Sequence, residues 1–397
     1  MGVVRRFRAG DVIKPADVMR RESVESLVTG ADEYYRSAIA KGATTFLKSK
    51  PFHSFVESPQ VLVRLGWMLH GGKLTAGLHV AEYGGGAGWL ATLLWQMGCH
   101  VTCVDASAAA LELARELSNE HRGLLAWPQA TFSTALTDGH TLPLADETMD
   151  RVICFDVFHH VPNQEEVLRE FFRVLKPGGI ACFSEPGLYH STMAASQEEM
   201  ANFRVLENDI VLEEIWRLAR RIGFSDIEIR PMLDASYSLT MDRYHSLLHG
   251  GGIGLRGRDA LVNGTESLSV FFLQKGTFAF DSRYPSALSA SITASSALTV
   301  SCTNTGQGRW LAKSLDGTDF GIVRLGLMRC DEKGAVVERD WIRVPLPHDV
   351  EPGQSIEIAC KLPNLEPRTP SIRVDLVSEH VKWFGATSNP IAVRVSP

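Results

Sequence analysis

Hydrophobic residues recur along the chain in two patterns, and the change between them falls near residue 280. Before it, short apolar runs alternate with amphipathic stretches, which is typical of strands alternating with helices. From about residue 285, small polar and apolar residues alternate with period two, and no helical pattern interrupts them. The first pattern predicts an α/β domain with a parallel sheet, and the second predicts an antiparallel β-sandwich of six to eight short strands. We therefore expect a helical segment at 1–57, an α/β domain at 58–280 and an all-β sandwich at 285–397.

Residues 78–107 have the order strand, glycine loop, helix, strand. The pattern predicts a strand over His79–Glu82, a helix over Trp89–Met97, and a second strand over His100–Val104 that ends at Asp105. The glycines permit backbone conformations closed to other residues, and the loop leads into a helix N-terminus with free N–H groups. An acidic residue about 20 positions further on can accept hydrogen bonds from ribose hydroxyls. These features together predict a nucleoside ligand, with a tight turn that binds nothing as the alternative.

The spacing of the glycines bears on which nucleoside is bound. A dinucleotide fingerprint G-x-G-x-x-G would need glycine at position 89, which is Trp89. The spacing present is Glu82, Gly84, Gly86, Gly88, which resembles the first motif of class I S-adenosylmethionine (AdoMet) methyltransferases.

Later segments resemble the remaining motifs of that family in order. They are DGHTLPLADETMD at 138–150, RVICFDVFHH at 151–160, LKPGG at 175–179 and the strand IACFSEP after it. The resemblance implies a seven-stranded Rossmann-like methyltransferase domain, with the ribose held at Asp105 and the adenine amine at Asp138. It assigns cofactor binding to Glu82, Tyr83, Gly84, Gly86, Gly88, Asp105, Ala106, Asp138, Gly139, Phe155 and Asp156.

The segments around this core complete the expected domain. The spacing of apolar residues over Ala31–Phe46 predicts a helix. The resemblance implies that this segment forms a lid over the cofactor, with Tyr34 and Tyr35 either facing the pocket or simply packed. Residues 211–224 form an amphipathic pattern with Gly223 as a helix stop. Residues 232–265 are expected to be irregular, and the run at 267–274 is expected to be the seventh strand.

Methyl transfer to a hydroxyl benefits from a general base, and histidine suits this role near neutral pH. The candidates are His159 and His160 after the fourth strand, and His190 after the fifth. Glu185, at the end of the fifth strand, is placed to orient His190 or to touch the substrate. No histidine–carboxylate cluster has metal-site spacing along the chain, so no metal is expected.

Composition limits the function further. The net charge of −6 argues against a general nucleic-acid surface, and no apolar run is long enough to span a membrane. Arg5, Arg6 and Arg8 are not followed by an apolar stretch, so the N-terminus does not resemble a secretory signal. The seven cysteines form no C-x-x-C pair, which predicts buried free thiols and a reducing cytoplasm.

The C-terminal part also resembles a known module. Asn304-Thr305-Gly306 followed by Trp310, then the segments 341–354 and 374–384, resemble β-sandwich modules of bacterial polysaccharide-assembly proteins. Trp310, Trp341 and Trp383 are expected either to stack on sugar rings or to fill the sandwich core.

These observations predict an AdoMet-dependent methyltransferase that O-methylates a sugar hydroxyl of a bacterial surface polysaccharide or its precursor. It is expected in the cytoplasm or peripherally at the inner membrane, with polysaccharide-assembly proteins as partners. A small-molecule methyltransferase and a catalytically silent glycan-binding scaffold are the alternatives.

Overall fold

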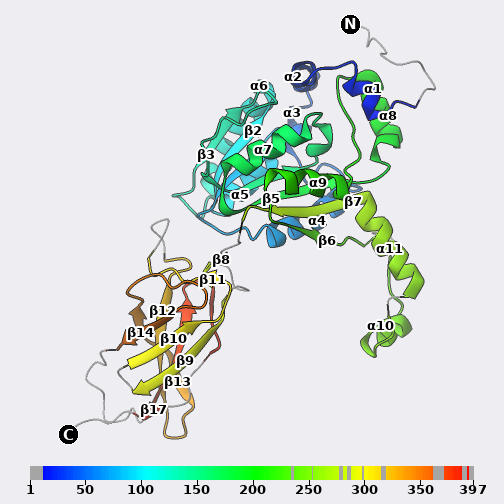
Figure 1. Cartoon of the computed structure of the whole chain (residues 1–397). Coiled ribbons are helices and arrows are strands. Elements are labelled where there is room, and N and C mark those ends of the chain that lie inside the picture. Colours follow the sequence, from blue (N-terminus) through cyan, green and yellow to red (C-terminus); the bar gives the residue numbers. More distant parts are fainter. Residues whose placement is uncertain are drawn as a thin grey trace. The chain divides into compact units, whose positions relative to one another are not determined.

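The chain forms two compact units, Met1–Phe278 and Ala279–Pro397, which are described separately (Figure 1). The computed structural model describes residues 12–233, 237–252, 254–276, 280–283, 288–296, 299–313, 319–360, 371–386 and 391–392.

The first unit is built on a seven-stranded sheet with the order β3-β2-β1-β4-β5-β7-β6. Neighbouring strands from β3 to β5 are parallel, whereas β7 runs antiparallel to both β5 and β6. The strands are β1 (His79–Tyr83), β2 (His100–Asp105), β3 (Phe132–Leu136), β4 (Met149–Phe155), β5 (Leu175–Pro186), β6 (Asp226–Arg230) and β7 (Leu268–Gln274). This confirms the predicted Rossmann-like methyltransferase fold, including the strand at the end of the domain.

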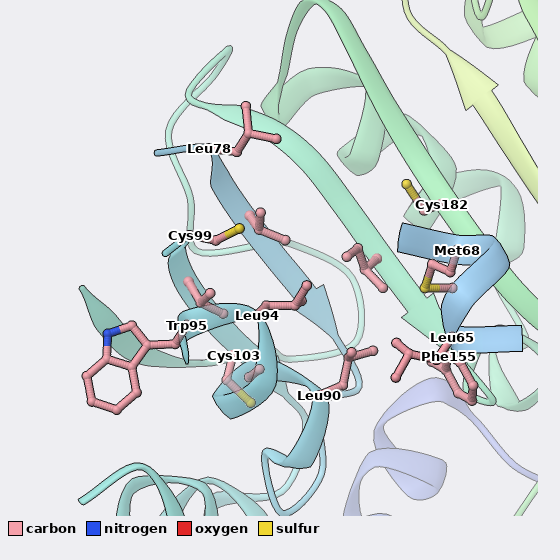
Figure 2. Packing of buried hydrophobic residues seen from close by; sticks show 14 of the residues in the cluster. Leu65, Met68, Leu78, Leu90, Leu94, Trp95, Cys99, Cys103, Phe155 and Cys182 are labelled. Carbon is pink, nitrogen blue, oxygen red and sulfur yellow. The ribbon is translucent and has the colours of Figure 1, made fainter. Parts of the chain in front are cut away.

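Helices cover both faces of this sheet, as Figure 1 shows. One face packs against α4 (Ser58–Gly71), α5 (Trp89–Gln96) and α6 (Ala108–His121), and the other against α7 (Gln164–Val174) and α9 (Leu212–Ile222). Figure 2 shows the first of these layers, where Leu90 and Leu94 of α5 and Met68 of α4 meet the sheet. Their apolar side chains recur at helical spacing, so each helix buries one stripe. Burying these stripes fixes where the strand ends lie, and those ends carry the site.

The N-terminal helices form a small core of their own with a later part of the chain. The helices are α1 (Pro15–Met19), α2 (Val24–Ala40) and α3 (Thr44–Lys48), and α8 (Ala194–Asn202) packs beside them. Val18 and Leu27 are buried here against Met200 and Leu206, and we call this cluster of side chains the lid core. We call α1 and α2 the lid helices, because α2 also covers the loop after β1.

One prediction for this unit was wrong. Residues 232–265 include α10 (Met241–Leu248) and most of α11 (Gly254–Ser267) instead of being irregular throughout. Thr240 caps α10 by accepting a hydrogen bond from the backbone N–H of Arg243. The glycines at 250–252 fall between the two helices, and those at 254, 257 and 264 lower the helix propensity that the sequence pattern can show.

The second unit consists of β-sheets, as the period-two pattern predicted. Its strands are β8 (Phe280–Asp281), β9 (Ala290–Ser296), β10 (Thr299–Asn304), β11 (Gly308–Arg309), β12 (Val323–Cys330), β13 (Val336–Pro345), β14 (Ser355–Ala359), β15 (Ser371–Ser378), β16 (Lys382–Trp383) and β17 (Ile391–Ala392). A three-stranded sheet β14-β10-β9 and a larger sheet containing β13-β12-β15-β16 enclose one core. β12 and β13 form an antiparallel hairpin. The alternating residues IAVRVS at 391–396 also predict a strand, but this stretch lies largely outside the described residues.

The tryptophans of this unit differ in their surroundings. Trp310 is completely buried in the core, so of its two expected roles it fills the core and does not stack on a sugar. Trp341 packs partly against the same core. The ring of Trp383 has the guanidinium groups of Arg339 and Arg343 at 4.7 and 4.5 Å from its centroid.

Two further expectations can be compared with the structure. All seven cysteines are buried and unpaired, which confirms the prediction of free thiols. Among the described residues, no helix has the length and apolar character that a membrane crossing needs.

Candidate active site

The loop after β1 depends on its glycines for backbone reasons. Gly84, Gly86 and Gly88 all have positive φ, at 70°, 54° and 80°. A Cβ at Gly88 would lie 2.6 Å from the Cβ of Ala114, so α6 closes directly onto the loop. At Gly86, by contrast, the close neighbour of such a Cβ would be the hydroxyl of Tyr35 from α2, at 2.4 Å. Gly86 is therefore the glycine of the loop that faces the lid.

Two buried carboxyl groups lie beside this loop. Asp105 accepts hydrogen bonds from the backbone N–H groups of Gly86 and Ser107, each at 2.8 Å. Glu82 is buried, and its Oε2 has no hydrogen-bond partner among the described residues. Burial raises the pKa of Glu82 to about 8, and burial also raises that of Asp105. An unpartnered buried acceptor beside a glycine loop fits a cationic group such as the ammonium of AdoMet.

The structure places the other predicted cofactor residues at the same strand ends, where they differ in how accessible their side chains are to a ligand. The exposed carboxylate of Asp138 accepts hydrogen bonds from the backbone N–H groups of His140 and Thr141, at 2.9 and 2.7 Å. Gly139 lies under Val24 and Val28 of α2, each of which would be within 3 Å of an added Cβ. The side chain of Tyr83 is buried against Phe171, so at this position only the backbone remains for a ligand. Ala106 follows Asp105 directly and is partly buried.

α2 reaches across the loop through polar contacts as well. Asp32 accepts hydrogen bonds from the hydroxyl of Ser107 at 2.8 Å and the backbone N–H of Ala109 at 3.1 Å. Tyr35 is partly buried, while Tyr34 is about half exposed and stacks edge-on against Phe203. Burial raises the pKa of Tyr35 well above its usual range, and the nearby charge of Asp105 adds to this. Of the two tyrosines, Tyr35 is the one that faces the loop.

At the end of β4, Phe155 and Asp156 are engaged by an arginine from α4. Arg64 donates to both oxygens of Asp156, at 2.5 and 2.9 Å, and lies 4.6 Å from the ring centre of Phe155. Although burial opposes ionisation, the charge of Arg64 holds the pKa of Asp156 below its usual range. Asp156 also has a φ of 54°, a left-handed conformation that is uncommon for residues other than glycine. The sequence reading missed Arg64, which lies on an amphipathic helix with no motif to single it out.

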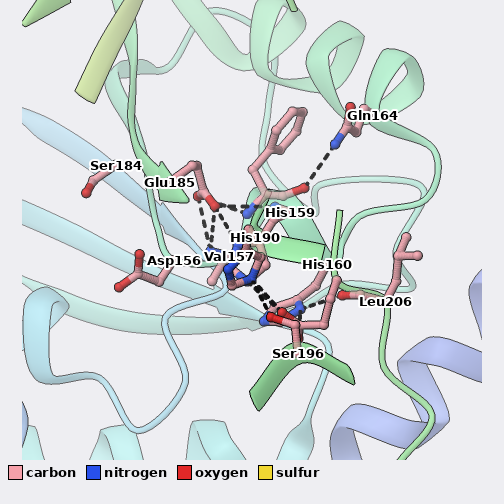
Figure 3. A network of polar contacts seen from close by, with 12 residues as sticks. Asp156, Val157, His159, His160, Gln164, Ser184, Glu185, His190, Ser196 and Leu206 are labelled. Atoms are coloured by element: carbon pink, nitrogen blue, oxygen red, sulfur yellow. Dashed lines mark hydrogen bonds and ion pairs between the residues drawn. The ribbon is translucent and has the colours of Figure 1, made fainter. Parts of the chain in front are cut away.

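The three candidate histidines come together with two glutamates, Glu185 and Glu207. Figure 3 labels the histidines and Glu185. Nδ1 of His159 lies 2.7 Å from Oε2 of Glu185, whose carboxylate also accepts backbone N–H groups from residues 157–159. Nε2 of His190 lies 2.6 Å from Oε2 of Glu207. Nδ1 of His160 lies 2.7 Å from the carbonyl oxygen of Leu206 and 3.3 Å from Oε1 of Glu207. We call these five residues, His159, His160, Glu185, His190 and Glu207, the histidine cluster.

Charge is distributed unevenly over the histidine cluster. Burial alone would lower the pKa of His160, but the hydrogen bond and charge of Glu207 raise it to about 9. Burial and the neighbouring His160 lower the pKa of His159 well below its usual range. Burial, followed by the charge of Asp156, raises the pKa of Glu185 to about 7. At neutral pH, His160 is therefore protonated and paired with Glu207, while His159 is neutral.

This distribution limits which histidine can accept a proton. His160 already carries one, and His159 is buried with Nδ1 held by Glu185. His190 is partly exposed, and Glu207 holds its Nε2, which leaves Nδ1 as the free ring nitrogen. No hydrogen bond to that Nδ1 is found within the described part of the chain. A carboxylate that fixes the tautomer of a histidine in this way is a common arrangement for a general base.

Sequence reasoning found the histidines but missed the glutamate that organises them. Glu207 lies in the segment between α8 and α9, far from any motif, and has a buried side chain. Its position follows from tertiary packing, because the neighbouring Leu206 is fixed in the lid core.

Comparison with known proteins gives one family match for this unit. Residues 81–183 match the family model described as a methyltransferase domain. An arsenite methyltransferase of Aquipseudomonas alcaligenes is 32% identical over 186 residues, which are 45% of this chain and 53% of that protein. A ubiquinone biosynthesis O-methyltransferase of Pseudomonas fluorescens is 33% identical over 135 residues, which are 34% of this chain and 53% of that protein. The chain thus spans about half the length of these curated relatives.

Among solved structures, a phosphoethanolamine N-methyltransferase 2 of Haemonchus contortus in complex with S-adenosylhomocysteine is 21% identical with a TM-score of 0.44. The match covers 65% of this chain and 61% of that one.

Proposed function

We propose that the protein is an AdoMet-dependent methyltransferase that acts on a hydroxyl group. The match of residues 81–183 to the methyltransferase domain model supports the reaction type. The observation that carries the choice of acceptor is the His190–Glu207 pair, a partly exposed imidazole with its tautomer set by a buried carboxylate. Such a group can take the proton of a hydroxyl as it attacks a methyl group.

AdoMet supplies an electrophilic methyl group on a sulfonium. The protein then has to hold the donor, align the acceptor and remove one proton. Asp105 would hold the ribose, and the unpartnered oxygen of Glu82 would face the methionine ammonium. Asp138 and Gly139 would contact the adenine, under the cover of α2. Phe155 and Asp156, fixed by Arg64, would form the wall between donor and acceptor.

The side chains of the site favour an alcohol as the methyl acceptor. The first unit's cysteines are fully buried, so no thiol is available to bind a soft acceptor such as arsenite. A polar cluster with a candidate base suits an alcohol. We propose a sugar hydroxyl of a bacterial surface polysaccharide or its precursor, with the second unit contacting the glycan or the assembly proteins. A small-molecule alcohol is the alternative.

The cofactor part is tested by equilibrium binding of AdoMet to the full chain. Asp105→Ala should weaken binding at least tenfold, because the ribose loses its acceptor, while Asp146→Ala on the exposed surface should leave it unchanged. Equal affinities for both variants would refute the assignment of Asp105.

The acceptor part is tested with AdoMet labelled on its methyl group, incubated with a lysate of cells that lack the protein. Label in polymer or lipid-linked glycan, lost in Asp105→Ala, would support the sugar acceptor. Label found only among small molecules would support the alternative, a small-molecule alcohol as the acceptor. Absence of label with AdoMet binding intact would count against methyl transfer.

A further inference from the structure

We propose that the histidine cluster is a binding site for a divalent transition-metal ion, held by His159, His160 and Glu207. One potential ligand atom from each of these residues lies within 4.8 Å of the other two. No metal was expected from the spacing of residues along the chain, because Glu207 approaches the two histidines only through the fold.

The distances suit a single ion. Nδ1 of His160 is 3.3 Å from Oε1 of Glu207. Nε2 of His159 is 3.8 Å from the other oxygen of that carboxylate, and one ligand atom from each of the three residues lies within 4.8 Å of the other two. Ligand atoms bound at about 2.0–2.2 Å to one ion are roughly 3–4 Å apart, so only small movements are needed. The carbonyl oxygen of Leu206, beside the same nitrogen of His160, offers a fourth donor.

An independent observation points to a missing ligand. Glu207 is 97% buried. Nδ1 of His160 lies 3.3 Å from its Oε1, but Oε1 makes no hydrogen bond of good geometry within the described part of the chain. A buried carboxylate oxygen is costly unless a cation or a well-aligned donor satisfies it. Its other oxygen already bonds His190, so a metal at Oε1 would leave the proposed base outside the ligand set.

The surroundings resemble those that metal ligands need. Nδ1 of His159 is held by the buried Glu185 at 2.7 Å, which turns Nε2 toward Glu207. In a histidine that binds a metal, the N–H of the second ring nitrogen usually donates a hydrogen bond to a carboxylate in this way. Two imidazoles and one carboxylate favour Zn²⁺, Fe²⁺ or Mn²⁺ over Mg²⁺, which prefers oxygen ligands alone.

Metal binding can be measured without a methyl acceptor. A failure to bind metal can therefore be distinguished from a failure of the proposed methyl transfer. If the protein methylates a hydroxyl, a metal here would also lie next to His190, where a Lewis acid can lower the pKa of an alcohol.

The test uses the full chain, stripped with a chelator and then equilibrated with Zn²⁺ in excess Mg²⁺. We expect one retained Zn²⁺ per chain, and a Co²⁺-loaded sample should show visible absorption from nitrogen and oxygen ligands. Glu207→Gln and His160→Gln should each lower the affinity more than 100-fold. Glu185→Gln should lower it by about 10- to 100-fold, as expected for a residue that only orients a ligand.

His140→Gln is the matched control, because His140 also contacts two carboxylates, Glu25 and Glu166, at a partly exposed site. It should retain the ion. Circular dichroism establishes that each variant is folded, and the Co²⁺ spectrum of the unmodified chain gives a result that needs no variant. Retention below one ion in ten chains, or equal retention by all variants, would overturn the proposal and leave the His160–Glu207 ion pair as the cluster's resting state.

Discussion

At the scale of single residues, the site is marked by buried carboxyl groups whose hydrogen-bonding capacity is not fully used. Glu82 and Glu207 are both buried carboxyl groups with one oxygen that makes no hydrogen bond of good geometry within the described residues, although that oxygen of Glu207 has Nδ1 of His160 at 3.3 Å. Their environments have opposite effects on their pKa values. Burial dominates at Glu82 and raises its pKa, whereas the contacts with His160 and His190 overcome burial at Glu207 and lower its pKa. Glu82 is thus neutral at pH 7 and Glu207 is charged.

This difference predicts proton release on cofactor binding. With a pKa of about 8, Glu82 is protonated at pH 7, and the methionine ammonium would favour its charged form. AdoMet binding should therefore release close to one proton at pH 7 and almost none at pH 9. Calorimetry in buffers of different ionisation enthalpy measures this number. Glu82→Gln should bind with no release at either pH, and undiminished release in that variant would assign the proton to another group.

The same residue predicts how stability depends on pH. The folded pKa of Glu82 lies above its ordinary value of 4.5, so the folded state binds the proton more tightly than the unfolded state. Its contribution to the free energy of unfolding is therefore complete below pH 4.5 and is lost as pH rises through 8. Denaturant titrations of Glu82→Gln should show a smaller loss between pH 5 and 9 than the unmodified protein.

His190 makes a separate prediction about turnover. His190→Gln removes the free ring nitrogen but keeps a side chain that can donate a hydrogen bond to Glu207. We expect the turnover rate to fall by about 10²- to 10⁴-fold, as for loss of a general base, with AdoMet affinity unchanged. His140→Gln serves as the control, since its side chain contacts Glu25 and Glu166 away from the cluster. Turnover within a factor of two of the unmodified enzyme would exclude His190 as the base.

At the scale of elements, the lid helices and the histidine cluster share a support. Leu206 buries its side chain in the lid core with Leu27 and Val18, while its carbonyl oxygen bonds His160. Glu207 follows immediately, so the packing of α2 fixes the backbone from which the carboxylate projects. We infer that closing α2 over the glycine loop and positioning Glu207 are coupled.

Leu27→Ala tests this coupling. Removing a buried leucine side chain costs about 2–5 kcal/mol, and here the loss should be confined to the lid core. Hydrogen exchange should become faster in residues 13–48 and 190–207 while the strands β1, β4 and β5 stay protected. Leu124→Ala, an exposed leucine, should change neither region. Faster exchange in the N-terminal residues alone would mean that the lid moves independently of Glu207.

The sequence predicted the strands and helices of the α/β core well because each carries a long apolar pattern tied to its burial. β1, α5 and β2 begin and end within one residue of the predicted positions. α10 and α11 were missed because their exposed leucines give no buried stripe and because α11 contains three glycines, at 254, 257 and 264. Glu207, Asp32 and Arg64 were missed for a different reason. Their partners are distant in sequence, so only the folded chain brings each carboxylate or guanidinium to its contact.

At the scale of the whole molecule, two units with separate hydrophobic cores predict separable functions. The first unit has cores on both faces of its sheet, and the second encloses its own around Trp310. A chain that ends at Phe278 should therefore fold and bind AdoMet with unchanged affinity. Thermal unfolding of the full chain should show two transitions, of which the shorter chain retains one. A shorter chain that is unfolded would mean that the first unit depends on the second.

Activity of the shorter chain separates catalysis from acceptor recognition. If the second unit holds a glycan, the shorter chain should methylate a soluble hydroxyl acceptor at the full rate but a polymeric one at least tenfold more slowly. Trp341 and Trp383 are both incompletely buried, and Trp383 has two cationic groups close to its ring, which suits a sugar carrying negative charge. Trp383→Ala in the full chain should therefore slow only the polymeric reaction, and Trp341→Ala, which alters a ring packed against the core, provides the comparison. Equal loss on both acceptors after truncation would mean that the second unit supports the fold of the first instead of selecting its substrate.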